Sequence, residues 1–135
     1  MKALSLKQPW AELILQGRKT VETRKWKTAF SGQFLIHSSL VPDAKNMALF
    51  GFAELPTGCI VGTAEITDVI EYPTMESFNN DEGRHCAHVT AYPKKRYGFV
   101  LANVRRIMPI PYKGQLNFFT VPDDIMSRKQ AEKGL

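Results

Sequence analysis

The residues with the clearest chemical potential lie between Gly17 and Arg24, in the run Gly-Arg-Lys-Thr-Val-Glu-Thr-Arg. Neighbouring cations such as Arg18 disfavour a further ammonium, which shifts the Lys19 amine toward its neutral, nucleophilic form. Arg24 offers a planar fork suited to a phosphate or a carboxylate. Glu22 can pair with Arg24, orient it or take part in proton transfer. The simpler alternative is a Glu22–Arg24 ion pair on a strand surface beside a solvated Lys19.

A strand is predicted over 20–26, because this stretch is rich in β-branched residues and too polar to be buried on both faces. Strand alternation places Glu22, Arg24 and Trp26 on one face, together with Thr20. Aromatic rings in a basic groove can stack unpaired bases, so Trp26 and Tyr97 are predicted as stacking partners. The alternative for each ring is a place in the core. Other rings next to basic residues are Phe30, Tyr92 and Tyr112.

Residues 85–88 read His-Cys-Ala-His and contain ligand types that zinc prefers. A closed zinc site needs four ligands, however, and the other candidates, His37 and Cys59, are distant in the sequence. We therefore predict two solvated histidines in a surface loop and no metal site. The chain also has no Gly-x-Ser-x-Gly elbow and no glycine-rich phosphate or dinucleotide loop, so no cofactor is predicted.

The elements that must position these residues are short and mostly extended. The residue pattern predicts strands at 3–6, 20–26, 32–38, 58–72, 97–107 and 116–121. Helices are predicted from Pro9 to Gln16 and over 42–50, whereas 73–95 is irregular or weakly helical. These elements indicate a mixed, mainly β fold: a small β-barrel of five or six strands with flanking short helices.

Within this fold, Gly62 is expected to mark a bulge or a close backbone approach in the long fourth strand. Four phenylalanines are assigned to the core: Phe34, Phe99, Phe118 and Phe119.

Length and composition indicate one domain, because 135 residues with 44% hydrophobic and 23% charged residues can build a single sizeable core. We expect the domain to occupy 1–126 and a polar tail to follow at 127–135. No apolar run approaches the roughly 18 residues of a membrane helix. Two cysteines, Cys59 and Cys86, do not make a disulfide framework. The expected location is therefore the cytoplasm, with no membrane partner.

The net charge of +5 is unevenly distributed along the chain. Residues 1–30 carry seven basic and two acidic residues, and residues 91–135 carry nine basic and three acidic residues. The middle, 31–90, carries two basic and eight acidic residues. If the two ends meet in space they form one positive surface, as expected of a protein that binds a polyanion. The alternative is that these charges only solvate two exposed regions.

The opening of the chain resembles that of ASCH domains, named for activating signal cointegrator homology. The resemblance rests on residues 4–14, Leu-Ser-Leu-Lys-Gln-Pro-Trp-Ala-Glu-Leu-Ile, followed by Gly17-x-Lys19-Thr20-x-Glu22-x-Arg24-x-Trp26. Segments 32–38 and 113–116 are also similar, so the resemblance covers roughly 3–121. It implies a PUA-like β-barrel with flanking helices, a cleft lined by the Gly-x-Lys-x-x-Glu-x-Arg element, and RNA or a nucleotide-like ligand.

The resemblance also suggests an activity, because some small bacterial members of the superfamily hydrolyse N4-acetylcytidine and others are described as ribonucleases. Lys19 matches the lysine regarded as the nucleophile of the amidohydrolases. Glu22 stands where those enzymes have a threonine, and the later glutamate corresponds by chain order to Glu82, with Glu65 as the second choice. Relatives with Gln-Pro and Thr-Val-Glu-Thr-Arg are regarded as nucleic-acid-binding.

Three functions are therefore expected, in this order. The first is a binding module for single-stranded RNA or a nucleotide, whose ligand-binding residues are Gln8, Trp10, Lys19, Glu22, Arg24, Trp26, His37 and Tyr97. The second is an amidohydrolase acting on the modified nucleoside N4-acetylcytidine, with Lys19, Glu22 and Glu82 as catalytic residues. The third is a ribonuclease, for which Lys19, Tyr97, His85 and His88 can be proposed without a specific pair. The sequence predicts no oligomeric state.

Overall fold

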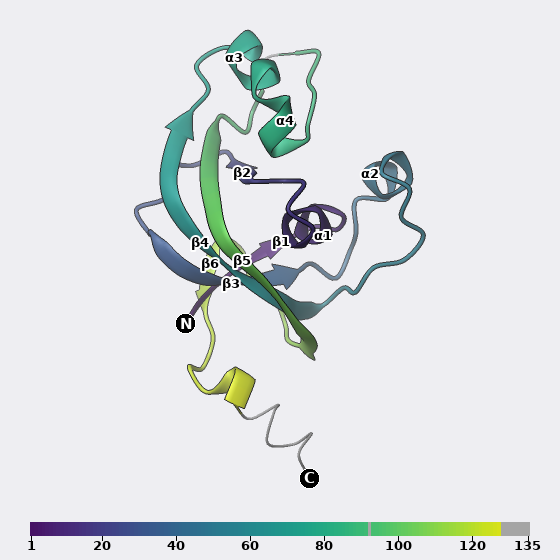
Figure 1. Ribbon diagram of the computed structural model, residues 1–135, viewed down its shortest axis with the longest axis vertical. Coiled ribbons are helices and arrows are strands. Elements are labelled where there is room, and N and C mark those ends of the chain that lie inside the picture. The colour runs from purple at the N-terminus through teal and green to yellow at the C-terminus, as the bar shows by residue number, and fades with distance from the viewer. Residues whose placement is uncertain (92, 128–135) are drawn as a thin grey trace.

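The structure is a computed structural model that describes residues 1–91 and 93–127. In these residues six strands form one mixed sheet in the order β2-β5-β4-β3-β1-β6, which curls into a half-barrel (Figure 1). The mainly β, PUA-like fold class with short flanking helices is thereby confirmed. The strands are β1 (Lys2–Leu6), β2 (Val21–Arg24), β3 (Gly32–Ser38), β4 (Cys59–Glu71), β5 (Tyr97–Pro111) and β6 (Phe118–Thr120).

The pairing of the strands is antiparallel except between β1 and β3, which run parallel. β5 extends to Pro111, beyond the predicted end at 107, because its last residues pair with Cys59 and Ile60. β2 pairs with β5 only over 97–100, so the far end of β5 is a sheet edge, where proline is tolerated. β6 begins at Phe118, later than predicted, because Asn117 has a left-handed φ of 58°.

The labelled helices are α1 (Trp10–Leu15), α2 (Ala44–Leu49), α3 (Met75–Asn80) and α4 (Glu82–His85), and residues 125–127 are also helical. α1 follows Pro9 and ends before Gly17, whose φ of 78° suits the predicted helix end. α2 begins after Asp43, whose carboxylate accepts a hydrogen bond from Asn46 N at 3.1 Å. α3 and α4 lie together beyond one end of β4 and β5 (Figure 1). The predicted irregular segment is therefore more helical than expected.

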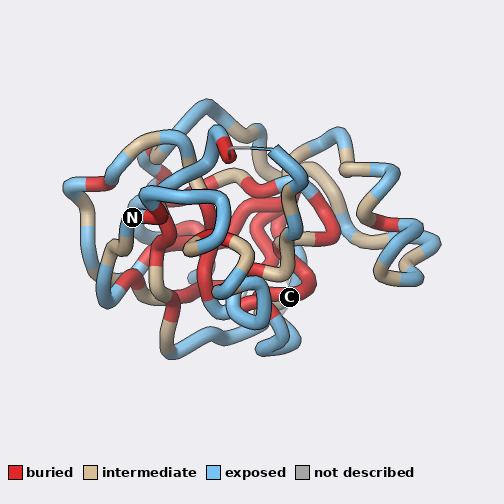
Figure 2. The backbone as a smooth tube through the Cα atoms, turned by 90° about the horizontal axis from the view of Figure 1, so that it is seen from above, coloured by how far each residue is buried: buried red, intermediate tan, exposed pale blue. Residues whose placement is uncertain are grey.

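The buried stretches of the chain gather in the middle of the molecule, and exposed segments surround them (Figure 2). Phe34, Phe99 and Phe119 are buried as predicted. Phe118 is partly buried and packs against the core, where its ring meets that of Phe34 edge-to-face. A second apolar cluster around Leu35 and Ile60 lies on the other face of the sheet. The chain therefore buries apolar side chains on both faces of its central strands.

β2 and β6 are the two edge strands of the sheet and do not pair with each other, but side chains connect this open side. The indole of Trp26, just after β2, packs edge-to-face on Phe118 of β6, with ring centres 5.8 Å apart. Arg24 Nη2 donates a 2.8 Å hydrogen bond to the backbone oxygen of Ser5 in β1. Arg24 and Trp26 thus close the open side of the half-barrel.

Helices long and apolar enough to span a membrane do not occur among the described residues. Tyr92 and residues 128–135, which include nearly all of the predicted polar tail, lie outside the described part of the chain.

Gly62→Ala is expected to lower the free energy of unfolding by about 1–3 kcal/mol, because the new methyl group overpacks the sheet. A Cβ at Gly62 would lie 2.6 Å from Arg105 O and 2.5 Å from Leu15 Cδ2, where β4 and β5 shift register. Urea unfolding measures the change. Gly83→Ala in α4, where a Cβ meets nothing within 4 Å, is the control and should leave stability unchanged or slightly higher. Equal effects at both positions would contradict the close approach.

Candidate functional site

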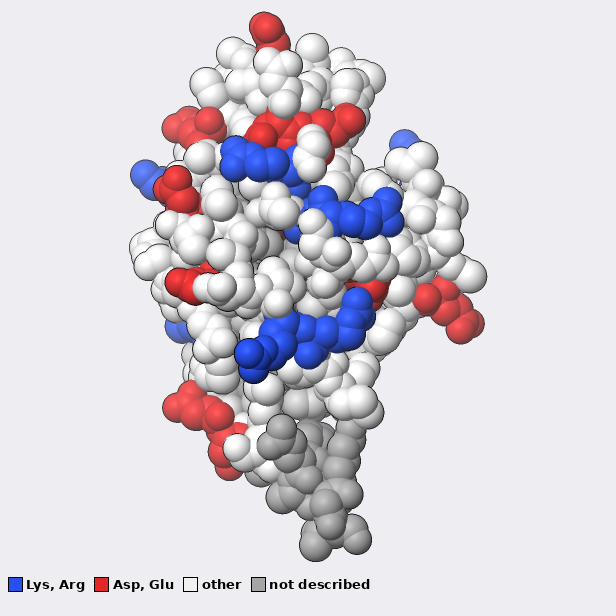
Figure 3. Space-filling view, in the orientation of Figure 1, with Lys and Arg blue, Asp and Glu red and all other residues white. Residues whose placement is uncertain are grey.

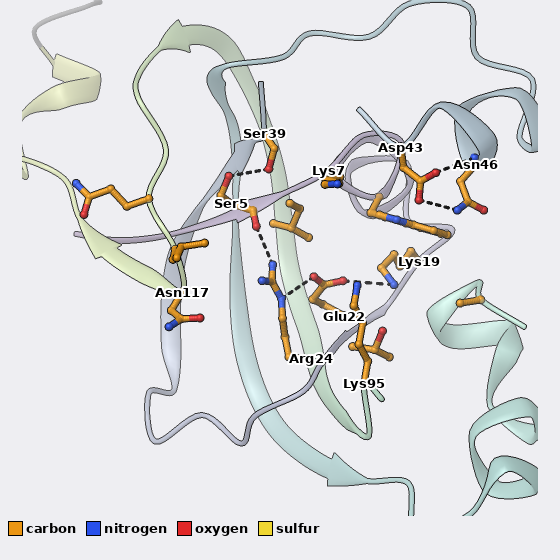
Figure 4. Close-up of a pocket in the computed structure, with 16 residues that line it drawn as sticks. Ser5, Lys7, Lys19, Glu22, Arg24, Ser39, Asp43, Asn46, Lys95 and Asn117 are labelled. Carbon is orange, nitrogen blue, oxygen red and sulfur yellow. Dashed lines mark hydrogen bonds and ion pairs between the residues drawn. The ribbon is translucent and has the colours of Figure 1, made fainter. Parts of the chain in front are cut away.

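A pocket of about 530 Å³, called the charged pocket below, opens where several chain segments converge (Figure 4). β1 and the turn after it contribute Ser5 and Lys7, and α1 contributes Trp10. The segment from α1 into β2 supplies Lys19, Glu22 and Arg24. The remaining polar lining consists of Thr23 in β2 and of residues from α2 and the connecting segments: Ser39, Asp43, Asn46, Lys95, Gln115 and Asn117.

Lys19 is only 2% exposed and is held by three groups. Its Nζ donates a 2.7 Å hydrogen bond to His85 O, lies 3.5 Å from Glu22 Oε1, and sits 5.1 Å from the ring centre of Trp10. Burial lowers the pKa of the Lys19 amine below its usual value, although the nearby Glu22 carboxylate opposes this shift. The lysine is therefore a fixed, desolvated amine and not the solvated side chain of the simpler alternative.

Glu22 lies between two cations. Its second oxygen, Oε2, accepts a 3.0 Å hydrogen bond from Arg24 Nε. Burial by itself raises the pKa of Glu22, but the charges of Arg24, Lys19 and Lys95 together hold that pKa below its usual value. The carboxylate is therefore ionised at neutral pH. Lys19, Glu22 and Arg24 form a continuous chain of charges along one wall of the charged pocket, and we call them the ion-pair chain (Figure 4).

The pocket has more positive than negative groups. Lys7 and Lys95 are exposed residues that line it in addition to Lys19 and Arg24, whereas its acidic residues are Glu22 and Asp43. Lys95 belongs to the basic C-terminal third of the sequence and the other cations belong to the first thirty residues. The two basic ends of the chain therefore meet at this pocket. On the face drawn in Figure 3, Lys and Arg side chains gather in belts across the middle, with many acidic side chains toward the margins.

A family model for the ASCH domain matches residues 4–111 of the chain. The chain belongs to the ASCH domain family. This ASCH domain is similar to the crystal structure of ASCH from Zymomonas mobilis, with 16% identity and a TM-score of 0.65 over 96% of this chain and 93% of that chain. At this identity the likeness shows the shared fold. A comparison with curated proteins found no match.

Two mutants of the Zymomonas mobilis protein are also similar in structure. A serine-to-alanine mutant matches with 15% identity and a TM-score of 0.67, over 97% of this chain and 94% of its own. A tyrosine-to-phenylalanine mutant matches with 14% identity and a TM-score of 0.60, over 96% of both chains. The match therefore spans nearly the whole of both proteins and is not limited to the signature element.

Of the residues predicted to form the site, the ASCH domain brings Trp10, Lys19, Glu22 and Arg24 together at the charged pocket. Gln8 is fully buried and serves the fold, because it donates to Pro56 O and accepts from Glu12 N.

Two predicted stacking rings belong to the core and not to the pocket lining. Trp26 packs on Phe99 and Phe118, and Tyr97 is half-buried against the same core cluster. β2 ends at Arg24, so the alternation that was expected to carry Trp26 onto the face of Glu22 stops before it. Among the residues that the structure describes, the aromatic side chain that lines the charged pocket is Trp10.

The later glutamates are also away from the charged pocket. Glu82, about half-exposed, pairs with His88 Nδ1 at 2.9 Å, and Glu65 accepts a hydrogen bond from Asn103 at 2.7 Å. Lys7, Lys95 and the hydroxyl and amide groups of the lining were not predicted from the sequence. The basic run Lys-Lys-Arg at 94–96 could have drawn attention to Lys95. Because Lys95 and Lys19 are far apart along the chain, however, no local pattern predicts that they are close in space.

The prediction of two solvated histidines is correct for the exposed His88 and wrong for His85, which is fully buried at the end of α4 near the pocket. Nε2 of the buried His85 donates a 2.6 Å hydrogen bond to Phe78 O, and its ring stacks on Phe78 with centres 4.1 Å apart. Burial lowers the pKa of His85. This anchoring fixes the carbonyl that Lys19 Nζ bonds. Within the described residues, no three His, Cys, Asp or Glu side chains gather as a metal ion would require.

Glu22→Gln is expected to lower the free energy of unfolding at pH 7 by about 3–5 kcal/mol, because it leaves the buried Lys19 and the partly buried Arg24 without their countercharge. The lowered pKa of Glu22 means that its ionised form stabilises the fold above the usual value of 4.5. That stabilisation is lost as the pH falls through the lowered pKa. The difference between wild type and variant should therefore shrink below about pH 4.

Urea unfolding over a pH series tests this, with Glu54→Gln at an exposed glutamate as the control. Glu54→Gln should change the free energy of unfolding very little at any pH. A Glu22→Gln cost that is small at pH 7, or that does not change with pH, would contradict the buried ion-pair chain.

Proposed function

We propose that this ASCH domain binds single-stranded RNA by taking one nucleotide into the charged pocket. The observation that carries the proposal is the convergence of four cations, Lys7, Lys19, Arg24 and Lys95, on a cavity of about 530 Å³. A cavity of this size is in the range of small-ligand sites. Its surplus of positive charge favours an anion, and its hydroxyl and amide groups suit the edges of a sugar and a base.

The inner and outer parts of the pocket have different tasks in this proposal. Lys7 and Lys95 are exposed, so they can neutralise phosphates of the approaching strand. Arg24 uses Nε and Nη2 for Glu22 and Ser5 O, and its guanidinium has further N–H donors that can bond a phosphate or a base edge. The Trp10 indole offers an aromatic surface for a base.

Binding to a single-stranded RNA decamer is expected to weaken as salt rises, by about 0.7 log units per log unit of salt for each phosphate contacted. Lys7→Ala and Lys95→Ala should each weaken binding and reduce that slope by about 0.7. Fluorescence anisotropy over a salt series measures both quantities. Lys27→Ala is the matched control, because Lys27 is exposed but does not line the pocket. Salt-independent binding, or none at about 50 mM salt, contradicts the proposal.

A second candidate function, deacetylation of N4-acetylcytidine, is favoured by one observation: burial lowers the pKa of the Lys19 amine, as a lysine nucleophile requires. Glu22, 3.5 Å away, is the carboxylate positioned to move a proton. Glu65 and Glu82 are engaged elsewhere, so the later glutamate expected of such an enzyme does not come from either. This is why binding ranks first.

Incubation with N4-acetylcytidine, followed by chromatography for cytidine, separates the two functions. If the domain is an amidohydrolase, wild type should release cytidine and Lys19→Ala should lose that release by at least about 100-fold, since the nucleophile is gone. Product that persists in Lys19→Ala excludes Lys19 as the nucleophile. RNA binding without any release of cytidine supports the binding function and rejects the amidohydrolase.

A further inference from the structure

A second cavity adjoins the charged pocket. It has a volume of about 690 Å³, and we call it the apolar cavity. The two cavities share Ser5, Ser39, Gln115 and Leu116 in their linings. They therefore form one groove that passes over the ends of β1 and β3 beside the segment before β6.

The chemistry of the two cavities differs. The apolar cavity is lined largely by carbon, including the side chains of Leu40, Leu116 and Tyr112, and Lys113 is the formally charged residue among its described lining. Leu40 and Leu116 are 76% and 90% exposed, so two large apolar side chains stand open to solvent at its edge. A flat, weakly polar group that covers them would release the water around them.

The inner wall of the apolar cavity is fixed in place. Nε2 of His37 donates a 2.7 Å hydrogen bond to Tyr112 O, which can only accept, and Nδ1 forms a 2.8 Å hydrogen bond with Ser5 Oγ. Gly114 packs so closely that a Cβ there would lie 2.6 Å from His37 Cε1. The buried His37 thus ties the segment after β5 to β1, and the cavity exists before any ligand arrives.

We infer that the apolar cavity holds the base of the nucleotide next to the one in the charged pocket. This inference rests on the proposed function. Consecutive nucleotides are joined by one phosphodiester, and the two cavities are joined by one shared wall with Lys113 on one side and Arg24 on the other. Single-stranded nucleic-acid grooves combine such cations with apolar and aromatic surfaces for successive bases. The recognised unit is therefore a dinucleotide step.

Four cytidine probes test the inference by calorimetry: pC, pCpC, and the two pCpC analogues in which one or the other base is removed. Wild type should bind pCpC at least about fivefold more tightly than either abasic analogue, because each base that stacks contributes that much. All the dinucleotides carry the same phosphates, so the gain measures the second base and not added charge. An equal affinity for pCpC and one abasic analogue overturns the inference.

Leu40→Ser locates the second base, because Leu40 lines the apolar cavity and not the charged pocket. The variant should bind pCpC severalfold more weakly than wild type and bind pC with unchanged affinity. Leu49→Ser is the matched control: Leu49 is 72% exposed and lines neither cavity, so both affinities should stay at wild-type values. Unfolding in urea checks that both variants are folded. An unchanged pCpC affinity in Leu40→Ser overturns the inference.

Two further outcomes separate this inference from the function on which it rests. Binding of pC with no gain from the second base rejects the apolar cavity as a subsite and leaves the proposed function standing. No binding of pC or of any RNA rejects both. If N4-acetylated pC binds more tightly than pC and Leu40→Ser removes that gain, the apolar cavity receives a base modification, and the dinucleotide step is rejected.

Discussion

The ion-pair chain of Lys19, Glu22 and Arg24 is the interaction on which both the fold and the charged pocket depend. Burying one of these charges alone would cost several kcal/mol, so each needs the others in place. Lys19 also bonds the end of α4, and Arg24 bonds the backbone of β1. The ion-pair chain therefore links the signature segment to two distant parts of the sequence. Loss of any one of these contacts leaves a desolvated charge without a partner.

In the half-barrel, the side-chain contacts that close the sheet lie at the charged pocket. Strand pairing ends at β2 and β6, and side chains bridge the space between them. Arg24 has both tasks, because the guanidinium that bonds Ser5 O also lines the charged pocket. A site built this way is rigid before the ligand binds, which reduces the entropy lost on binding. It also means that Lys19, Glu22 and Arg24 cannot change without affecting stability.

The choice between binding and catalysis depends on how the Lys19 amine is used. Burial favours its neutral form, whereas Glu22 beside it favours the ammonium. An ammonium is a partner for phosphate or a base oxygen, and a neutral amine is a nucleophile. The two roles place the same residue in the same pocket, so the site geometry serves both. The expected later glutamate distinguishes them, and neither Glu65 nor Glu82 lies at the pocket.

The sequence by itself determined the elements whose signals are local: the helix after Pro9, the strand at 32–38, the close approach at Gly62 and the family signature. It also predicted that Lys19, Glu22 and Arg24 lie close together, since all three belong to one short segment. Only the tertiary structure decided that Trp26 and Tyr97 serve the core, that Lys95 joins Lys19, and that His37 holds the wall of a second cavity. Curling of the sheet decides these contacts, because it brings together residues whose separation along the chain carries no local signal.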